Sequence, residues 1–320
     1  MIASPPALCV PTGLRCVRVT PAGIAPSGSP AGRRPRTRVN APRLANAAIE
    51  ALIAEAMLTP KPALVDQRGS GAHGDLDLDR MLRSAQALRA AFLGMATLAN
   101  GRRPDQALRE QLALIGREAE CDMFAASGGS NTHRGAIWVM GLLLAAVGIA
   151  GADASPREIA RLAGSIACHD DRFAPSRSSH GSLVCGLYGV AGARGQARAG
   201  FPHVVDVGLP ALWSARARGV DETSAQLDAL MAIMASLDDT CLLYRGGAVA
   251  LRAAHAGAGA VLALGGCSST AGRAALLRLD AQLLALHASP GGSADLLAAC
   301  LFLDQQCTPR HCSPRHCWSR

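Results

Sequence analysis

Apolar residues in the body of this chain recur every three or four positions, which is the spacing of one face of an α-helix. The residues from Ile49 to Met57 show this pattern, and those from Leu78 to Leu88 repeat it. Runs that alternate β-branched or aromatic residues with polar ones are nearly absent, and only 3% of the chain is aromatic. The sequence offers little from which to build strands, and it therefore predicts an all-α fold.

Helix-start signals extend this pattern along the chain. The segment Ser155-Pro156-Arg157-Glu158 is a capping box with proline at the first helical position, and Pro104 marks another start. Helical patterns also cover residues 221–239, 246–264, 270–288 and 293–303. We expect a single compact domain of roughly ten helices over residues 44–303.

The two ends of the chain differ from this body. Residues 1–43 lack periodicity and are rich in Pro, Gly, Ser and Arg, and residues 304–320 contain the repeat Pro-Arg-His-Cys. We expect a disordered or mis-assigned N-terminal extension and a disordered C-terminal tail. The net charge of +8 arises there, because the ends hold ten of the 32 basic residues and one of the 24 acidic residues. The body is nearly neutral, and we expect no nucleic-acid partner.

The chain shows neither an export signal nor a Cys-x-x-Cys pair among its 11 cysteines. We therefore expect a cytoplasmic protein with reduced cysteines. The uncharged run from Gly135 to Ala152 approaches the length of a membrane span, but glycines interrupt it. We expect a buried core helix there and no membrane partner.

Polar residues gather in the connections between the expected helices, first in residues 59–79. This segment contains three glycines that allow close backbone approach to a ligand, and it contains Lys61, the single lysine beside 31 arginines. Lys61 and Arg68 are suited to bind phosphate groups. The acidic residues carry the hard oxygen ligands that Mg²⁺ prefers, namely Asp66, Asp75 and Asp77. Capping of a helix explains Asp75 equally well.

Further polar segments lie downstream. Residues 128–135 form a glycine-rich turn before the most apolar helix, where unpaired N–H groups favour an anion. Asp170-Asp171 and Asp238-Asp239 are adjacent acids, so each pair either lies at the surface or contributes to a metal or acid/base site. Residues 189–202 are too rich in Gly and Arg for a simple helix.

Short motifs follow one another in order along the body, and they span essentially all of residues 44–303. They are Thr59-Pro-Lys-Pro62, Leu64-Val-Asp66, Gly71-Ala-His73, Asn131-Thr-His-Arg-Gly-Ala-Ile137, Ala193-Arg-Gly195, Gly200-Phe-Pro202, Asp239-Thr240, Arg245-Gly-Gly247 and Pro290-Gly-Gly-Ser-Ala-Asp-Leu-Leu297. Together they resemble the triphosphoribosyl-dephospho-CoA synthase family. The segment from Arg68 to His73 looks more like the malonate decarboxylase branch than the citrate lyase branch.

The resemblance implies a transferase reaction. The triphosphoribosyl group of ATP passes to the 2′-hydroxyl of 3′-dephospho-CoA, and adenine is released. The product is a prosthetic-group precursor that a separate transferase delivers to the acyl carrier protein of malonate decarboxylase. Three alternatives remain open: the same reaction for citrate lyase, a Mg²⁺-dependent N-glycosyl hydrolase, and a catalytically impaired homologue that binds the nucleotide.

The resemblance also implies roles for the polar residues, with Mg²⁺ as the cofactor. The expected nucleotide-binding residues are Lys61, Arg68, His73, Asn131, Arg134, Arg194 and Arg245. The expected metal ligands are Asp75, Asp77 and Asp238. The expected catalytic residues are Asp66, Asp170, Asp171 and Asp239, with His133 as a proton donor.

Three positions depart from the family pattern. Ala63 stands where Gly is usual, Gln196 where Glu is usual, and Tyr244 where His precedes Arg-Gly-Gly. Gln196 removes a carboxylate and Tyr244 removes a group that titrates near neutral pH, so both changes bear on activity.

Overall fold

The structure is a computed structural model that describes residues 39–175 and 179–306. Every regular element in these two ranges is a helix, and the backbone pairing of Asp66 with Gly69 is an isolated bridge. The predicted all-α fold is therefore confirmed. Most of the expected N-terminal extension and C-terminal tail, residues 1–38 and 307–320, lies outside the described residues.

The longest connection between consecutive helices is the loop between α1 and α2, residues 58–77. In the first half they are α1 (Ala41–Met57), α2 (Leu78–Ala87), α3 (Arg89–Ala99), α4 (Gln106–Ser127), α5 (Arg134–Ala150) and α6 (Pro156–Ala167). In the second half they are α7 (His180–Tyr188), α8 (Gly192–Arg198), the π-helix η1 (His203–Gly208), α9 (Leu209–Ala217), α10 (Glu222–Met234), α11 (Thr240–Ala263), α12 (Thr270–Ala285) and α13 (Gly291–Gln306).

The helix starts show which local signals determine the boundaries. Helix α6 begins at Pro156, and the Ser155 hydroxyl accepts the Glu158 N–H at 3.2 Å, as the capping box predicts. Helix α4 begins later than expected, because the Asp105 carboxylate caps it by accepting the Leu108 N–H at 2.7 Å. Pro104 therefore precedes this helix instead of opening it.

Two other boundaries differ from the sequence expectation. Helix α1 begins at Ala41, so the helical body starts three residues before the expected boundary at 44. Residues 189–202 contain the short helix α8 despite their glycines and arginines, and they lead directly into η1. Packing of α8 against α6 offsets its weak intrinsic propensity.

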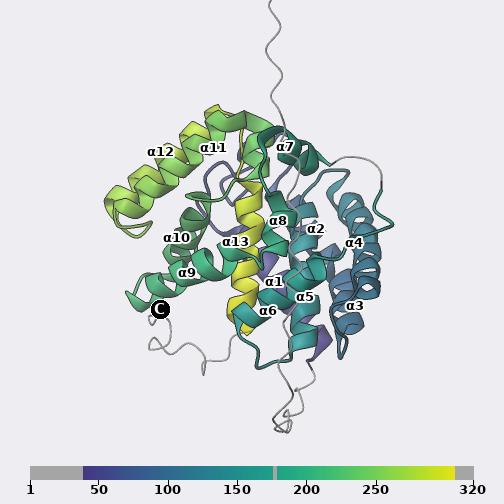
Figure 1. The fold of residues 1–320 in the computed structure, drawn as a ribbon. Helices are drawn as coiled ribbons and strands as arrows, with labels where there is room; N and C mark the ends of the chain where they lie inside the picture. Colours follow the sequence, from purple (N-terminus) through teal and green to yellow (C-terminus); the bar gives the residue numbers. More distant parts are fainter. Residues whose placement is uncertain (1–38, 176–178, 307–320) are drawn as a thin grey trace, which may run out of the picture. The chain divides into compact units, whose positions relative to one another are not determined.

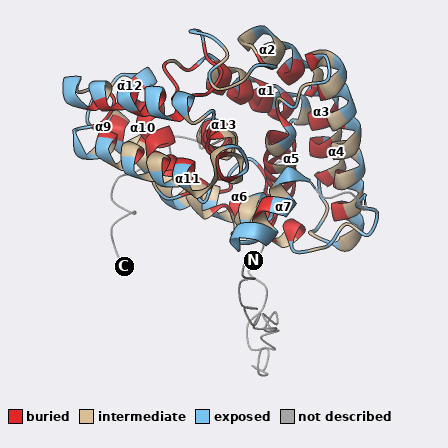
Figure 2. Ribbon diagram, turned by 90° about the horizontal axis from the view of Figure 1, so that it is seen from above, coloured by how far each residue is buried: buried red, intermediate tan, exposed pale blue. Residues whose placement is uncertain are grey.

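Helices α5 and α13 form the centre of the bundle. Every residue of α5 from Val139 to Ala150 is buried, and so is every residue of α13 from Leu296 to Leu303. In both views α13 lies between α10 on one side and α5 on the other, and Figure 2 shows the buried residues concentrated along these central helices (Figures 1 and 2). The burial of α5 confirms the core helix that the sequence predicts. No helix in the described part of the chain is long and apolar enough to cross a membrane.

Candidate active site

The loop between α1 and α2, residues 58–77, is organised around the buried carboxylate of Asp66. One carboxylate oxygen accepts the Lys61 N–H at 2.8 Å, and the other accepts the Arg68 N–H at 2.7 Å. The Arg68 guanidinium also donates to this carboxylate at 2.9 Å. Because three donors converge on it, Asp66 fixes the path of the loop and the direction in which Lys61 points.

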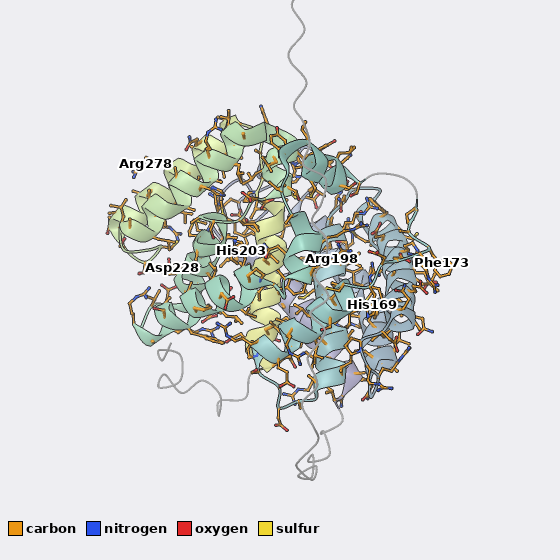
Figure 3. The ribbon with its side chains drawn as sticks, in the orientation of Figure 1. His169, Phe173, Arg198, His203, Asp228 and Arg278 are labelled. Atoms are coloured by element: carbon orange, nitrogen blue, oxygen red, sulfur yellow. The ribbon has the colours of Figure 1, made fainter. Side chains whose placement is uncertain are left out.

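Helix α12 holds the same loop from the other side through Asp280. This carboxylate accepts the Ala63 N–H at 2.8 Å and the Arg68 guanidinium at 2.7 Å. Arg278, two residues earlier on α12, is exposed and projects outward (Figure 3). Asp280 was not among the predicted site residues, because its partners are remote in sequence.

Lys61 is buried and forms an ion pair with Glu55 near the end of α1. The Lys61 ammonium donates to the Glu55 carboxylate and to the Glu55 carbonyl oxygen, each at 2.6 Å. Only 1% of Lys61 and 4% of Glu55 is exposed. Glu55 was not among the predicted site residues, although a charge on the apolar face of α1 was an available signal.

The turn before α5 brings a second polar residue inside. His133 is 2% exposed, and its Nδ1 lies 2.9 Å from the Ser84 hydroxyl oxygen. Because this hydroxyl also donates to the Met81 carbonyl at 3.0 Å, Ser84 is left to accept from Nδ1–H, and Nε2 then carries a lone pair. Within the described residues, buried Nε2 and the Thr132 hydroxyl have no hydrogen-bond partner.

The charge state of His133 follows from its surroundings. Burial, followed by the positive charge of Lys61, lowers the pKa of His133 to about 4. The ring is therefore neutral near pH 7, and with Nδ1 protonated it offers an acceptor at Nε2. This geometry favours acceptance of a hydrogen bond over the proton donation expected from the sequence.

Asp295 on α13 lies at the start of α5. Its carboxylate accepts the Ala136 N–H, and it lies so close to Gly135 that a side chain there would collide with it. Burial, reinforced by the carboxylates of Glu55 and Asp239, raises the pKa of Asp295 well above its usual range. Asp295 belongs to the motif of residues 290–297, but it was not among the predicted site residues.

Asp239, a predicted catalytic residue, joins α11 to α13. It is 1% exposed and caps α11 by accepting the Cys241 N–H at 2.8 Å. It also accepts the Ser293 N–H at 2.8 Å and the Ser293 hydroxyl at 2.9 Å. Burial raises the pKa of Asp239, and the hydrogen bonds oppose this shift without cancelling it.

These residues form what we call the central polar cluster: Glu55, Lys61, His133, Asp239 and Asp295. Pairwise charge effects link Lys61 with His133, and Asp295 with both other carboxylates. The members come from α1, the following loop, the start of α5, the start of α11, and α13, so segments far apart in the sequence assemble them. The nearly buried carboxylates of Glu55 and Asp239, the partly exposed one of Asp295 and one ammonium form a site suited to stabilise positive charge on a ligand.

Two further predicted residues meet near the start of α11. The Arg245 guanidinium lies 3.1 Å from Nδ1 of His73, and it thereby links the loop to α11. Burial, together with the Arg245 charge, lowers the pKa of His73 to about 4. Helix α11 is kinked at Gly247, where φ is 62°, so its first turn with Arg245 is directed separately from the rest.

Several predicted residues lie outside the central polar cluster. Arg134 pairs with Glu120 at 2.8 Å, and Asn131 accepts the Arg134 N–H at 3.3 Å. Asp170 pairs with Arg198 at 2.8 Å, and Asp171 pairs with Arg117 at 2.6 Å. Arg194 is exposed on α8. The two acids of the pair 170–171 thus hold separate arginines.

The three expected metal ligands do not come together. Asp77 caps α2 by accepting the Arg80 N–H at 2.8 Å, while Asp75 and Asp238 are exposed. The described ranges contain no group of three or more His, Cys, Asp or Glu side chains arranged to hold a metal ion. The residues present therefore do not form a protein cage for Mg²⁺.

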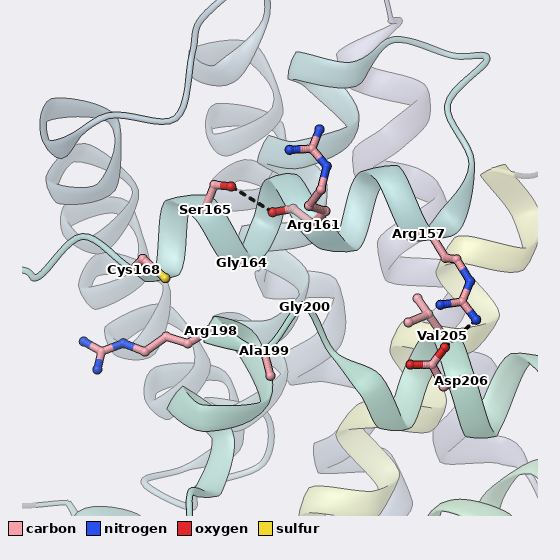
Figure 4. Close-up of a pocket in the computed structure, with 10 residues that line it drawn as sticks. All are labelled: Arg157, Arg161, Gly164, Ser165, Cys168, Arg198, Ala199, Gly200, Val205 and Asp206. Atoms are coloured by element: carbon pink, nitrogen blue, oxygen red, sulfur yellow. Dashed lines mark hydrogen bonds and ion pairs between the residues drawn. The ribbon is translucent and has the colours of Figure 1, made fainter. Parts of the chain in front are cut away.

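A surface cavity of about 350 Å³ lies between α6, α8 and η1 (Figure 4). Its arginines do not converge: Arg157 turns toward Asp206, and Arg198 points to the opposite side (Figure 4). None of the predicted site residues lines this cavity. We therefore place the candidate active site at the central polar cluster.

Comparison with known proteins agrees with the motifs. The profile of a family described as ATP:dephospho-CoA triphosphoribosyl transferase matches residues 41–311. A 2-(5''-triphosphoribosyl)-3'-dephosphocoenzyme-A synthase of Klebsiella pneumoniae is 54% identical over 262 residues, which cover 82% of this chain and 94% of the relative. A probable synthase of the same name from Pseudomonas paraeruginosa is 55% identical over 263 residues, which cover 82% of this chain and 90% of the relative. No solved structure gives a significant match. The chain belongs to the ATP:dephospho-CoA triphosphoribosyl transferase family.

Proposed function

We propose that this protein transfers the 5-triphosphoribosyl group of ATP to the 2′-hydroxyl of 3′-dephospho-CoA and releases adenine. Family membership and the names of two relatives that are 54% and 55% identical to it over 262 and 263 residues support this activity. The observation that carries the proposal within the structure is the central polar cluster, which concentrates buried carboxylates and a neutral histidine.

The cluster suits the charge that develops during this reaction. The bond between the ribose C1′ and adenine breaks, the bond between C1′ and the acceptor oxygen forms, and the acceptor hydroxyl loses a proton. Positive charge builds on the ribose as the first bond lengthens, and fixed carboxylates stabilise it. We assign this electrostatic role to Asp239, whose four recorded donors hold it in one orientation.

The triphosphate requires cations at the edge of the cluster. Arg134, Arg194 and Arg245 are exposed and therefore accessible to it, whereas the Lys61 ammonium is buried against Glu55. Mg²⁺ usually binds through one or two carboxylates together with substrate phosphates. We propose that Mg²⁺ enters as the counter-ion of ATP, with phosphate oxygens providing most of its ligands.

The segment from Arg68 to His73 supports a finer proposal, that the product is destined for the acyl carrier protein of malonate decarboxylase. Arg68 and His73 tie this segment to α12 and α11, so it borders the site directly. The test is to supply the reaction product to the separate transferases of the two pathways. Modification of the citrate lyase carrier alone would contradict the assignment.

The activity is tested by incubating the protein with ATP and Mg²⁺, with and without 3′-dephospho-CoA. Adenine release that requires the acceptor, together with a product whose mass equals the coupled molecule, supports transfer. Adenine release without the acceptor indicates a hydrolase. ATP binding with no release indicates an impaired homologue, for which Gln196 is the first position to restore to Glu, since its buried Oε1 lacks a partner among the described residues.

A further inference from the structure

The carboxylates near the proposed site differ in how many donors already occupy them. Asp66 accepts three N–H groups, Asp239 accepts from α11 and α13, and Glu55 is paired with Lys61. The donor recorded for Asp295 among the described residues is the Ala136 N–H alone. Asp295 therefore keeps most of its acceptor capacity for a ligand.

Asp295 is also placed where a ligand can reach it. Asp295 is partly exposed, whereas Asp239 and Glu55 are almost completely buried. Gly135 faces its carboxylate and contributes no side chain to cover it. His133 lies two residues before this glycine, and its buried Nε2 has no partner among the described residues, so a second hydrogen-bonding position is open at the start of α5.

The surroundings of Asp295 increase the affinity of its carboxylate for a proton. Burial, with Glu55 on α1 and Asp239 at the start of α11, raises the pKa of Asp295 well above its usual range. His133 is the weaker base, because its pKa is lowered to about 4. A carboxylate with a raised pKa accepts a proton near neutral pH more readily than an ordinary aspartate does.

We propose that Asp295 is the catalytic residue that takes the proton from the acceptor 2′-hydroxyl. The oxygen then forms its bond to C1′, the bond from C1′ to adenine breaks, and adenine leaves with the bonding electron pair and takes a proton from solvent. Asp295 returns its own proton to solvent after the product departs. This inference rests on the proposed function, because the hydroxyl belongs to the proposed acceptor.

The test compares Asp295→Asn with Asp122→Asn, the same substitution at an exposed residue of α4. We expect Asp295→Asn to lower the rate of product formation by about 100-fold or more, which is the usual contribution of a general base. The affinity for ATP should change by less than about threefold, and Asp122→Asn should retain wild-type activity. If the wild type and Asp295→Asn form product at the same rate, this inference is wrong and the proposed function stands. If the wild type forms no product, both the proposed function and this inference are wrong.

The pH profile and the melting temperature separate a base from a structural residue. The titratable groups that interact with Asp295 are Glu55, Asp239 and Cys241. The rate of the wild type should rise with pH as Asp295 ionises, and the rate of Asp295→Asn should not show this rise.

Because a raised folded-state pKa makes ionised Asp295 destabilising at higher pH, Asp295→Asn should also melt at a higher temperature than the wild type at pH 8. If the rate of Asp295→Asn still rises with pH, Asp295 is not the base. If Asp295→Asn loses activity and also melts at a lower temperature than the wild type, Asp295 has a structural role.

A second variant, Asp295→Ala, keeps the inference testable if Asp295→Asn does not fold. Asp295→Ala leaves an open space beside Gly135, and added formate can place a small carboxylate there. We expect formate to restore product formation at least tenfold in Asp295→Ala and not to stimulate the wild type. Failure of formate to rescue a folded Asp295→Ala overturns the assignment.

Discussion

At the scale of single residues, the buried pair of Lys61 and Glu55 shows how function and stability are combined. The ammonium satisfies two acceptors of the same glutamate in a place that is closed to water. Its removal leaves a buried carboxylate without a counter-charge, and breaking such pairs typically costs about 3–5 kcal/mol. The sequence indicated Lys61 through its uniqueness, but only the structure shows that its partner is internal.

We expect Lys61→Met to lower the free energy of unfolding by about 3 kcal/mol, because it breaks this pair. Urea denaturation followed by circular dichroism measures the loss. The double variant Glu55→Gln/Lys61→Met should be more stable than Lys61→Met alone, since it removes the uncompensated charge. A single variant as stable as the wild type would show that the pair lies in contact with water.

At the scale of elements, the contact of α5 with α13 depends on the missing side chain of Gly135. A Cβ at this position would meet the Asp295 carboxylate. We expect Gly135→Ala to reduce activity at least tenfold and to lower the melting temperature. Gly94→Ala in α3 is the matched control, because its Cβ would have the Ile115 side chain at 3.8 Å as its neighbour. That variant should be more stable by about 0.5–1 kcal/mol, the usual gain from replacing glycine inside a helix.

The docking of the loop 58–77 onto α12 is a second property of the elements. Asp280 pairs with Ala63 and Arg68 at the same time. We expect Asp280→Ala to speed hydrogen exchange at the Ala63 amide and to raise the KM for ATP, because the loop loses its anchor. Exchange in α10 should stay unchanged. Unaltered exchange at Ala63 would mean that Asp66 alone holds the loop.

At the scale of the whole molecule, acid stability depends on buried histidine. The pKa of His133 is lowered to about 4, so between about pH 6.5 and 4 the unfolded chain binds a proton that the folded chain does not. The free energy of unfolding therefore falls as the pH falls through this window, by about 3 kcal/mol for this group. Asp239 and Asp295 oppose the trend, because their pKa values are raised.

The contribution of His133 is isolated by comparing the wild type with His133→Gln in urea at pH 7 and at pH 4.5. The variant lacks the titrating ring, so the stability difference between the two proteins should shrink by about 2–3 kcal/mol at the lower pH. A constant difference across this range would show that His133 titrates normally in the folded protein.

The whole molecule also shows what local sequence patterns can predict. Helical periodicity and capping residues were sufficient for the all-α fold and for the start of α6. The site was harder, because its contacts join remote segments: Ala63 and Asp280 are 217 positions apart. Glu55 and Asp295 lie inside helices, where periodicity alone assigns a residue to the core or to the surface and does not identify a buried charge. Asp239 was found because its pair with Asp238 stands out in the sequence.

The burial of Lys61 has a consequence for the chemistry of the intact protein. Lys61 is the chain's single lysine, and 1% of it is exposed. Acylating reagents and amine-reactive cross-linkers therefore find no accessible lysine side chain while this part of the molecule is folded. The same amine becomes reactive when the bundle opens, so a single acylation event at Lys61 reports unfolding without any engineered label.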